Sequence, residues 1–231
     1  MAQATDLTRR QWLRGSMAAA GLAMLGGPDA LEAAEDVHKW ALADVTPSTV
    51  AGPFYPLLNK PVDRDTDLTL IDGRAARAQG PVLYLAGQVL NIKGQPIKGV
   101  EVEIWQANSA GRYDHPSDPN PAPVDPNFQG YGVTTTDAEG RYRFKTIKPG
   151  GYPVIPGWDR PPHVHFQLTG RADRLVTQMW FPEEPLNRQD RLFTMLPPAA
   201  QRMLTARMEP ASGNLEPGSR LAIFNILVAN G

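Results

Sequence analysis

Apolar and polar residues alternate in short stretches from residue 82 onward, a pattern typical of β-strands separated by turns. An apolar run spans residues 82–90. Residues 100–105 alternate strictly, with Val100, Val102 and Ile104 on one side, which predicts a half-buried strand. Further strands are predicted over residues 141–147, 163–168, 175–181 and 221–228.

The segments between these strands predict long loops and little helix. Residues 114–130 contain five prolines and form a long irregular loop, a kind of segment that is functional or disordered in most domains. Pro198 suits the first turn of one short helix that ends near Ala206. Residues 35–80 are proline-rich without a sustained apolar period and are interpreted as an arm with loops. The expected fold is all-β: a single β-sandwich, prealbumin-like, over residues 81–231.

The composition narrows the possible functions. Of the 231 residues, 42% are hydrophobic and 44 are glycine or proline, which favours a globular protein rich in turns. The formal net charge of −1 lacks the basic excess of a nucleic-acid-binding domain. The absence of cysteine excludes disulfides, thiolate zinc sites, iron–sulfur clusters and cysteine nucleophiles.

The N-terminus has the features of an export signal. Residues 8–14 read Thr-Arg-Arg-Gln-Trp-Leu-Arg and precede an apolar run too short to span a bilayer as a helix. The paired Arg9 and Arg10 resemble the twin-arginine export motif; the alternative is an ordinary cationic N-terminus. We expect residues 1–34 to be a signal peptide, cleaved between Ala30 and Ala34. The mature protein is then periplasmic or secreted, with no membrane span.

The most informative short motif is His163-Val164-His165. In a strand, alternate side chains point to the same face, so the two imidazoles project together while Val164 faces the core. Two imidazoles on one face can bind a single metal ion, although the pattern alone is a weak signal. Without cysteine, further ligands must be mostly oxygen donors, and a phenolate among them would favour ferric iron.

A series of motifs surrounds this pair, and together they resemble a known family. In order they are TVAGPFY (49–55), WQAN (105–108), GRY (111–113), DPNF (125–128), TDAEGRY (136–142), IKPGGY (147–152), RPPHVHF (160–166) and TQMWF (177–181). This series is similar to that of the intradiol ring-cleavage dioxygenases, over about residues 45–185. The loop after WQAN resembles that of the catalytic (beta) subunit of protocatechuate 3,4-dioxygenases.

The resemblance implies a reaction and roles for individual residues. By position, Tyr113, Tyr152, His163 and His165 match the ligands of a non-haem Fe(III) ion. The family cleaves a catechol between its two hydroxylated carbons with O2, giving a cis,cis-muconate-type diacid. Tyr152 matches a ligand that also acts as general base, Arg160 an arginine that stabilises negative charge on the substrate, and Gln178 a glutamine that positions groups in the pocket.

The resemblance leaves the substrate and the assembly open. The family's protocatechuate enzymes carry tryptophan two residues after the second ligand tyrosine, where this chain has Val154, a change in a pocket wall that argues against protocatechuate itself. The expected substrate is a protocatechuate-like or otherwise substituted catechol. Those enzymes also pair with a related subunit, so the resemblance leaves both such a pairing and a homo-oligomer open for this chain.

Two other functions compete with this interpretation. Residues 82–147 alone would also fit a non-catalytic, exported β-sandwich binding module, but such a module has no need for Tyr152, Arg160 and the two histidines together. A divalent-metal enzyme of the cupin type could use the histidines, but not the tyrosines.

Overall fold

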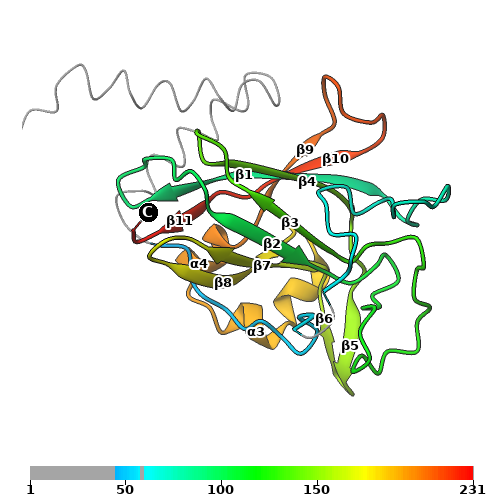
Figure 1. The fold of residues 1–231 in the computed structure, drawn as a ribbon. Coiled ribbons are helices and arrows are strands. Elements are labelled where there is room, and N and C mark those ends of the chain that lie inside the picture. The colour runs from blue at the N-terminus through cyan, green and yellow to red at the C-terminus, as the bar shows by residue number, and fades with distance from the viewer. Residues whose placement is uncertain (1–44, 58–59, 231) are drawn as a thin grey trace, which may run out of the picture.

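The computed structural model describes residues 45–57 and 60–230, and two β-sheets form its body (Figure 1). In the first sheet, β1 (Val82–Asn91) pairs antiparallel with β4 (Arg141–Ile147). On its other side β1 pairs parallel with β10 (Arg220–Ile223) and then β11 (Ile226–Val228), and β9 (Arg207–Pro210) extends the sheet beyond β10.

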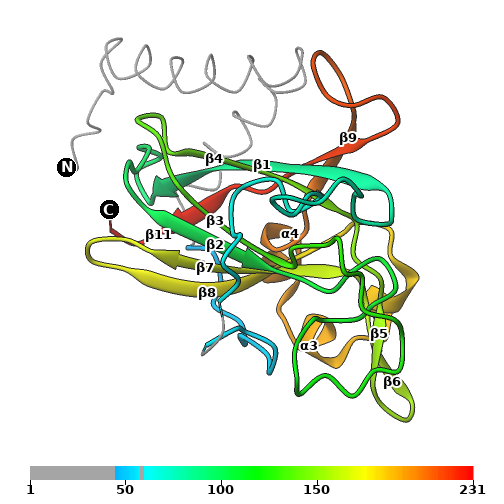
Figure 2. The ribbon, with the colours of Figure 1, turned by 45° about the vertical axis from the view of Figure 1, so that its right-hand side comes forward.

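The second sheet is antiparallel, in the order β3, β2, β7, β8. Its strands are β3 (Tyr131–Thr135), β2 (Glu101–Trp105), β7 (His163–Thr169) and β8 (Arg174–Trp180). A separate hairpin of β5 (Tyr152–Ile155) and β6 (Trp158–Arg160) lies at the same end of the molecule as the loop after β2 (Figure 2). Helical segments are short: η1 (Pro185–Arg188), α3 (Arg191–Thr194) and α4 (Pro198–Met203).

The core lies between the inward faces of the two sheets. Leu85 and Phe144 of the first sheet and Ile104, Val164 and Phe166 of the second are all fully buried. Alternation along each strand places these side chains on one face, which is the arrangement of a β-sandwich. The predicted all-β sandwich with little helix is therefore confirmed.

Several predicted elements differ in detail. Residues 221–228, predicted as one strand, are β10 and β11, because Phe224 turns its buried ring into the core while its backbone N–H donates to the Ala86 carbonyl at 2.9 Å. The predicted helix ends at Met203 rather than Ala206. Strands β5, β6 and β9 and the segments η1 and α3 were not predicted, because each spans only three or four residues, too short to show a period. The five-residue β3, which directly follows the proline-rich loop, was also not predicted.

The described part of the N-terminal arm, residues 45–57 and 60–80, contains no strand or helix and runs along both sheets. Thr46 N–H donates to the Leu227 carbonyl and Thr49 N–H to the Val176 carbonyl, while Leu68 is fully buried in the core. The expected signal peptide, residues 1–34, and residues 35–44 lie outside the described residues. Within those residues, no helix is long and apolar enough to cross a membrane.

Candidate metal centre

The four residues predicted as metal ligands lie together on the outer face of the second sheet. His163 and His165 come from β7, Tyr152 begins β5, and Tyr113 lies in the loop after β2. Ring centroids are 4.8 Å apart for the two histidines, 5.6 Å for Tyr152 and His163, 5.5 Å for the two tyrosines, and 6.3 Å for Tyr113 and His165. All four side chains are buried.

The two histidines present their Nε2 atoms to each other at 3.1 Å. Nδ1 of His163 lies 2.7 Å from the Pro161 carbonyl oxygen, so this nitrogen carries the proton and Nε2 carries the lone pair. The His165 ring stacks on Trp105 at 4.9 Å with an angle of 8° between the planes. A backbone carbonyl on one ring and an indole on the other therefore fix the direction of both imidazoles.

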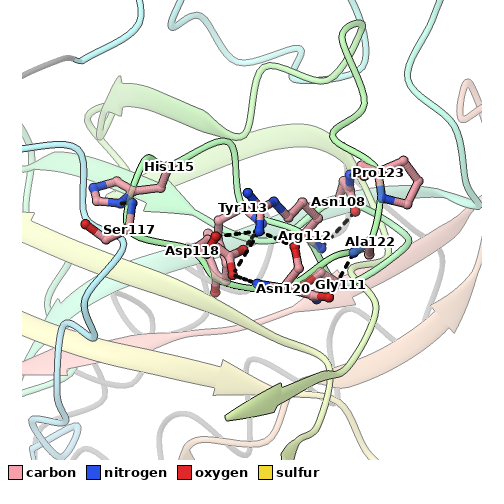
Figure 3. Close-up of polar contacts among 10 residues, drawn as sticks. All are labelled: Asn108, Gly111, Arg112, Tyr113, His115, Ser117, Asp118, Asn120, Ala122 and Pro123. Atoms are coloured by element: carbon pink, nitrogen blue, oxygen red, sulfur yellow. Dashed lines mark hydrogen bonds and ion pairs between the residues drawn. The ribbon is translucent and has the colours of Figure 1, made fainter.

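A hydrogen-bonded loop fixes Tyr113 (Figure 3). The Asp118 carboxylate accepts from the Tyr113 backbone N–H at 2.8 Å, and the Asn120 side chain donates to the Gly111 carbonyl at 2.8 Å. Arg112 donates to the carbonyls of Asp118 and Asn120 from inside the same loop. These bonds hold the backbone on both sides of Tyr113, whose hydroxyl has no hydrogen-bond partner among the described residues.

Two glycines allow the loops of Tyr113 and Tyr152 to meet. Gly111 adopts φ +79°, and a Cβ added there would lie 2.2 Å from the carbonyl oxygen of Gly151. Only glycine permits such an approach of two backbones. As a result the tyrosine rings meet edge to face, with 87° between their planes.

Arg160 and Gln178, the other two predicted site residues, are joined beside this cluster. Arg160 pairs with Tyr152 across the β5–β6 hairpin, and its guanidinium donates to the Gln178 side-chain oxygen at 2.6 Å. Its Nε lies 3.2 Å from the Asp190 carboxylate, which is completely buried. Gln178 in turn donates to the Val50 carbonyl at 2.6 Å. Gln178 thus connects the arginine to the arm.

The N-terminal arm covers the cluster. From the sequence, residues 49–55 of this arm were recognised only as one of the family's motifs, and their position over the site was not predicted. A Cβ on Gly52 would lie 3.3 Å from the His165 ring, and the Phe54 ring lies 4.6 Å from that of Tyr113. Residues 100–105 were predicted to form a strand with one buried and one exposed face. The predicted exposure of the outer face is wrong, because Glu103 and Trp105 are buried beneath the arm. Alternation within a strand carries no information about what covers its polar face.

Burial sets the protonation state of the four side chains. It raises the pKa of Tyr113 well above that of a free phenol, and it raises that of Tyr152, where the nearby Arg160 opposes the shift. Burial, together with the charge of Arg160, holds the pKa of His163 and of His165 well below the usual value. Without a bound cation, the cluster is therefore neutral at pH 7.

The donor set fits a ferric ion. Within residues 45–57 and 60–230, no group of three or more His, Cys, Asp or Glu side chains is placed to hold a metal. The phenols of Tyr113 and Tyr152 lie beside His163 and His165, and the buried Tyr113 hydroxyl, which has no hydrogen-bond partner in this part of the chain, is a suitable metal ligand. Two imidazoles with two phenolates are a hard, anionic set that matches Fe(III).

Comparison with known proteins identifies the family. A family model described as "Dioxygenase" matches residues 50–227, which is most of the chain. The protocatechuate 3,4-dioxygenase beta chain of Burkholderia cepacia is 48% identical over 147 residues, which cover 62% of this chain and 63% of that one. The chain belongs to the intradiol dioxygenase family. The predicted resemblance to beta subunits of protocatechuate 3,4-dioxygenase is thereby confirmed.

Other members of the intradiol dioxygenase family are similar along the same region. Catechol 1,2-dioxygenase 1 of Acinetobacter lwoffii is 33% identical over 175 residues, which cover 68% of this chain and 54% of that one. The present chain thus spans between half and two thirds of the length of these two relatives. The structure of hydroxyquinol 1,2-dioxygenase from Pseudomonas putida DLL-E4 has the same fold, with a TM-score of 0.62. The superposition covers 96% of this chain and 84% of that one, at 20% sequence identity.

Proposed function

We propose that this chain is a non-haem Fe(III) intradiol dioxygenase acting on a protocatechuate-like or otherwise substituted catechol. The ring would open between the two hydroxylated carbons, and both atoms of O2 would enter a cis,cis-muconate-type diacid. The observation that carries the proposal is the convergence of two buried phenols and two buried imidazoles beneath the arm.

In this proposal Tyr113, Tyr152, His163 and His165 hold the ion. When bound, ferric iron would draw electron density from a catecholate and so make the substrate ring reactive towards O2. The protein supplies the direction of the two Nε2 atoms, through the Pro161 carbonyl and the Trp105 ring. It also excludes water, because the arm and the loops bury the cluster.

Tyr152 is the proposed general base. It is the first residue of the β5–β6 hairpin, where it pairs with Arg160, and its side chain is buried within the cluster. Its phenolate oxygen would take up a proton from a catechol hydroxyl and become a neutral phenol. The raised pKa of Tyr152 favours that protonated form.

Arg160 is the proposed electrostatic partner of the substrate. Its guanidinium is buried, and Asp190 and Gln178 fix its direction from two sides. A fixed cation in a site that excludes water stabilises negative charge as it develops on the substrate oxygens. Gln178 serves as a positioning residue, since it contacts Arg160 and the arm.

Oxygen uptake tests this function. The iron-loaded protein should consume O2 with catechol, protocatechuate or hydroxyquinol and produce a ring-opened diacid, while Tyr152→Phe should lose this activity. Tyr84→Phe, on the outer face of the first sheet, is the matched control and should retain it. Binding of catechols without O2 uptake by the iron-loaded protein would instead support a non-catalytic binding module.

We also propose that the protein is exported by the twin-arginine route, from the Arg9–Arg10 pair. Replacing both arginines by lysine should retain the protein in the cytoplasm with its N-terminal segment uncleaved. Unchanged export of that variant would contradict the proposal.

A further inference from the structure

A buried carboxylate on the second sheet has no role in the proposed chemistry. Glu103 is 2% exposed and lies on the outer face of β2, two residues before Trp105. A buried carboxylate is costly unless it is paired and hydrogen-bonded. The structure shows which groups satisfy it.

Both partners of Glu103 come from the N-terminal arm. The Tyr55 hydroxyl donates to one carboxylate oxygen at 2.6 Å, and the Lys60 ammonium donates to the other at 2.8 Å. Lys60 also lies over the rings of Tyr55 and Tyr131, with its Nζ 5.5 and 5.4 Å from their centroids. Although burial raises it, hydrogen bonds from Lys60 and Tyr55 lower the pKa of Glu103 below its usual value, so the carboxylate is charged at neutral pH.

Tyr55 also joins two strands of the sheet. Its oxygen accepts from the Gln167 side chain of β7 at 3.2 Å, and Arg174 of β8 donates to that same glutamine at 2.6 Å. One phenol therefore ties the arm to β2 through Glu103 and to β7 through Gln167. Gln167 lies two residues after His165, on the same face of the strand.

The contacts continue from this cluster to the candidate metal centre. The Tyr55 ring packs edge to face on Trp105 at 4.8 Å, and Trp105 stacks on His165. Two residues that precede Tyr55 lie over the ligands: the Phe54 ring packs on Tyr113, and Gly52 is so close to His165 that an added Cβ would lie 3.3 Å from its ring. The position of Tyr55 therefore sets the position of the backbone that covers both ligands.

We propose that Tyr55, Lys60 and Glu103, here called the arm anchor, are positioning residues that hold residues 50–55 over the metal centre. Without the anchor the arm would lift from the sheet, and the stacked Trp105 and His165 rings would lose the cover that Tyr55 and Gly52 provide. The catalytic consequence rests on the proposed function, whereas the closure of the arm does not.

Hydrogen exchange in the metal-free protein tests the anchor directly. Glu103→Gln keeps the shape of the side chain but removes the charge that holds Lys60, and Tyr55→Phe removes only the hydroxyl. Each should speed amide exchange in residues 49–57 by about tenfold or more, while exchange in β1 and β4 stays unchanged. Glu216→Gln is the matched control, because Glu216 pairs with Arg77 and Lys145 on the surface of the other sheet.

The iron-loaded protein provides the second readout. Glu103→Gln and Tyr55→Phe should lower kcat and shift the visible absorption of the bound iron. The spectral shift separates this effect from a loss of global stability, which would lower the amount of active protein without shifting the band. Exchange in residues 49–57 equal to that of the unaltered protein, or accelerated equally in β1 and β4, would overturn the proposal. If the unaltered protein shows no ring cleavage while the arm still loosens selectively in the variants, the proposed function fails and the anchor stands.

Discussion

The Nε2 atoms of His163 and His165 face each other at 3.1 Å in a buried site. The Pro161 carbonyl accepts the proton of the other His163 nitrogen, so the lone pair of His163 Nε2 is directed at its neighbour. Burial holds the pKa of both imidazoles well below the usual value, so neither histidine ring is charged at neutral pH. Two neutral imidazoles arranged in this way are prepared to bind one cation between them.

Replacing either histidine should remove the bound metal. His163→Asn and His165→Asn each lose one imidazole donor, and we expect iron content after loading to fall to a small fraction of that of the unaltered protein. Metal analysis of the purified variants measures this. His115→Asn is the control, because His115 packs beside Phe54, whereas the other two rings meet Tyr113 and Tyr152. Full iron content in His165→Asn would contradict the site.

Iron binding should release protons from the tyrosines. Burial raises the pKa of both phenols, so they are protonated in the metal-free protein at neutral pH and must lose their protons to bind the ion. The apparent affinity for iron therefore rises as pH rises. In a pH-stat, Tyr152→Phe should release about one proton fewer per iron bound than the unaltered protein from the same iron source. Equal release by the two proteins would exclude Tyr152 as a ligand.

The contact between Gly111 and Gly151 should be needed for both stability and metal binding. Gly111→Ala places a methyl group 2.2 Å from the Gly151 carbonyl oxygen and forces the two tyrosine loops apart. Gly157 has the same φ of +79° with nothing within 4 Å, so Gly157→Ala should cost only about 1–2 kcal/mol of conformational strain. Denaturant unfolding with iron analysis should show a larger stability loss in Gly111→Ala, together with loss of iron. Similar behaviour of the two variants would show that the contact is unimportant.

Arg160 should matter more for turnover than for iron binding. Arg160→Lys keeps a cation beside Asp190 but loses the planar guanidinium group, which contacts Asp190 and Gln178 at the same time. We expect kcat to fall by about 10²-fold or more with iron content retained. Arg160→Met should also destabilise the protein by about 3–5 kcal/mol, because the buried Asp190 carboxylate loses its counter-ion. Arg188→Lys, at an exposed position nearby, serves as the control for both measurements.

The sequence predicted the parts of this fold that have a clear period. Alternation along residues 163–168 places Val164 and Phe166 in the core and the two histidines opposite, as the structure has them. The two tyrosines were accessible only through the family resemblance, since Tyr113 lies in a loop and Tyr152 begins a strand of four residues, too short to show a period. Their approach depends on Gly111 and Gly151, which no local pattern distinguishes from ordinary turn glycines.

The contacts that the sequence did not predict are long-range. The alternating pattern predicts that Glu103 faces solvent. In the structure, Tyr55 and Lys60, which lie more than 40 residues away in the sequence, cover its side chain. Asp190, completely buried against Arg160, follows a 3-10 segment and caps a short helix, and nothing around it indicates a partner in β6. Interactions of this kind depend on how the arm and loops cover the sheet, which local patterns do not encode.

The visible absorption spectrum of the iron-loaded protein tests the central claim most directly. Coordination of Tyr113 and Tyr152 to Fe(III) predicts a broad phenolate-to-iron band that makes the protein burgundy red. The band should shift and weaken in Tyr113→Phe and Tyr152→Phe, but persist in Tyr84→Phe. A colourless protein that nevertheless contains stoichiometric ferric iron would contradict the account.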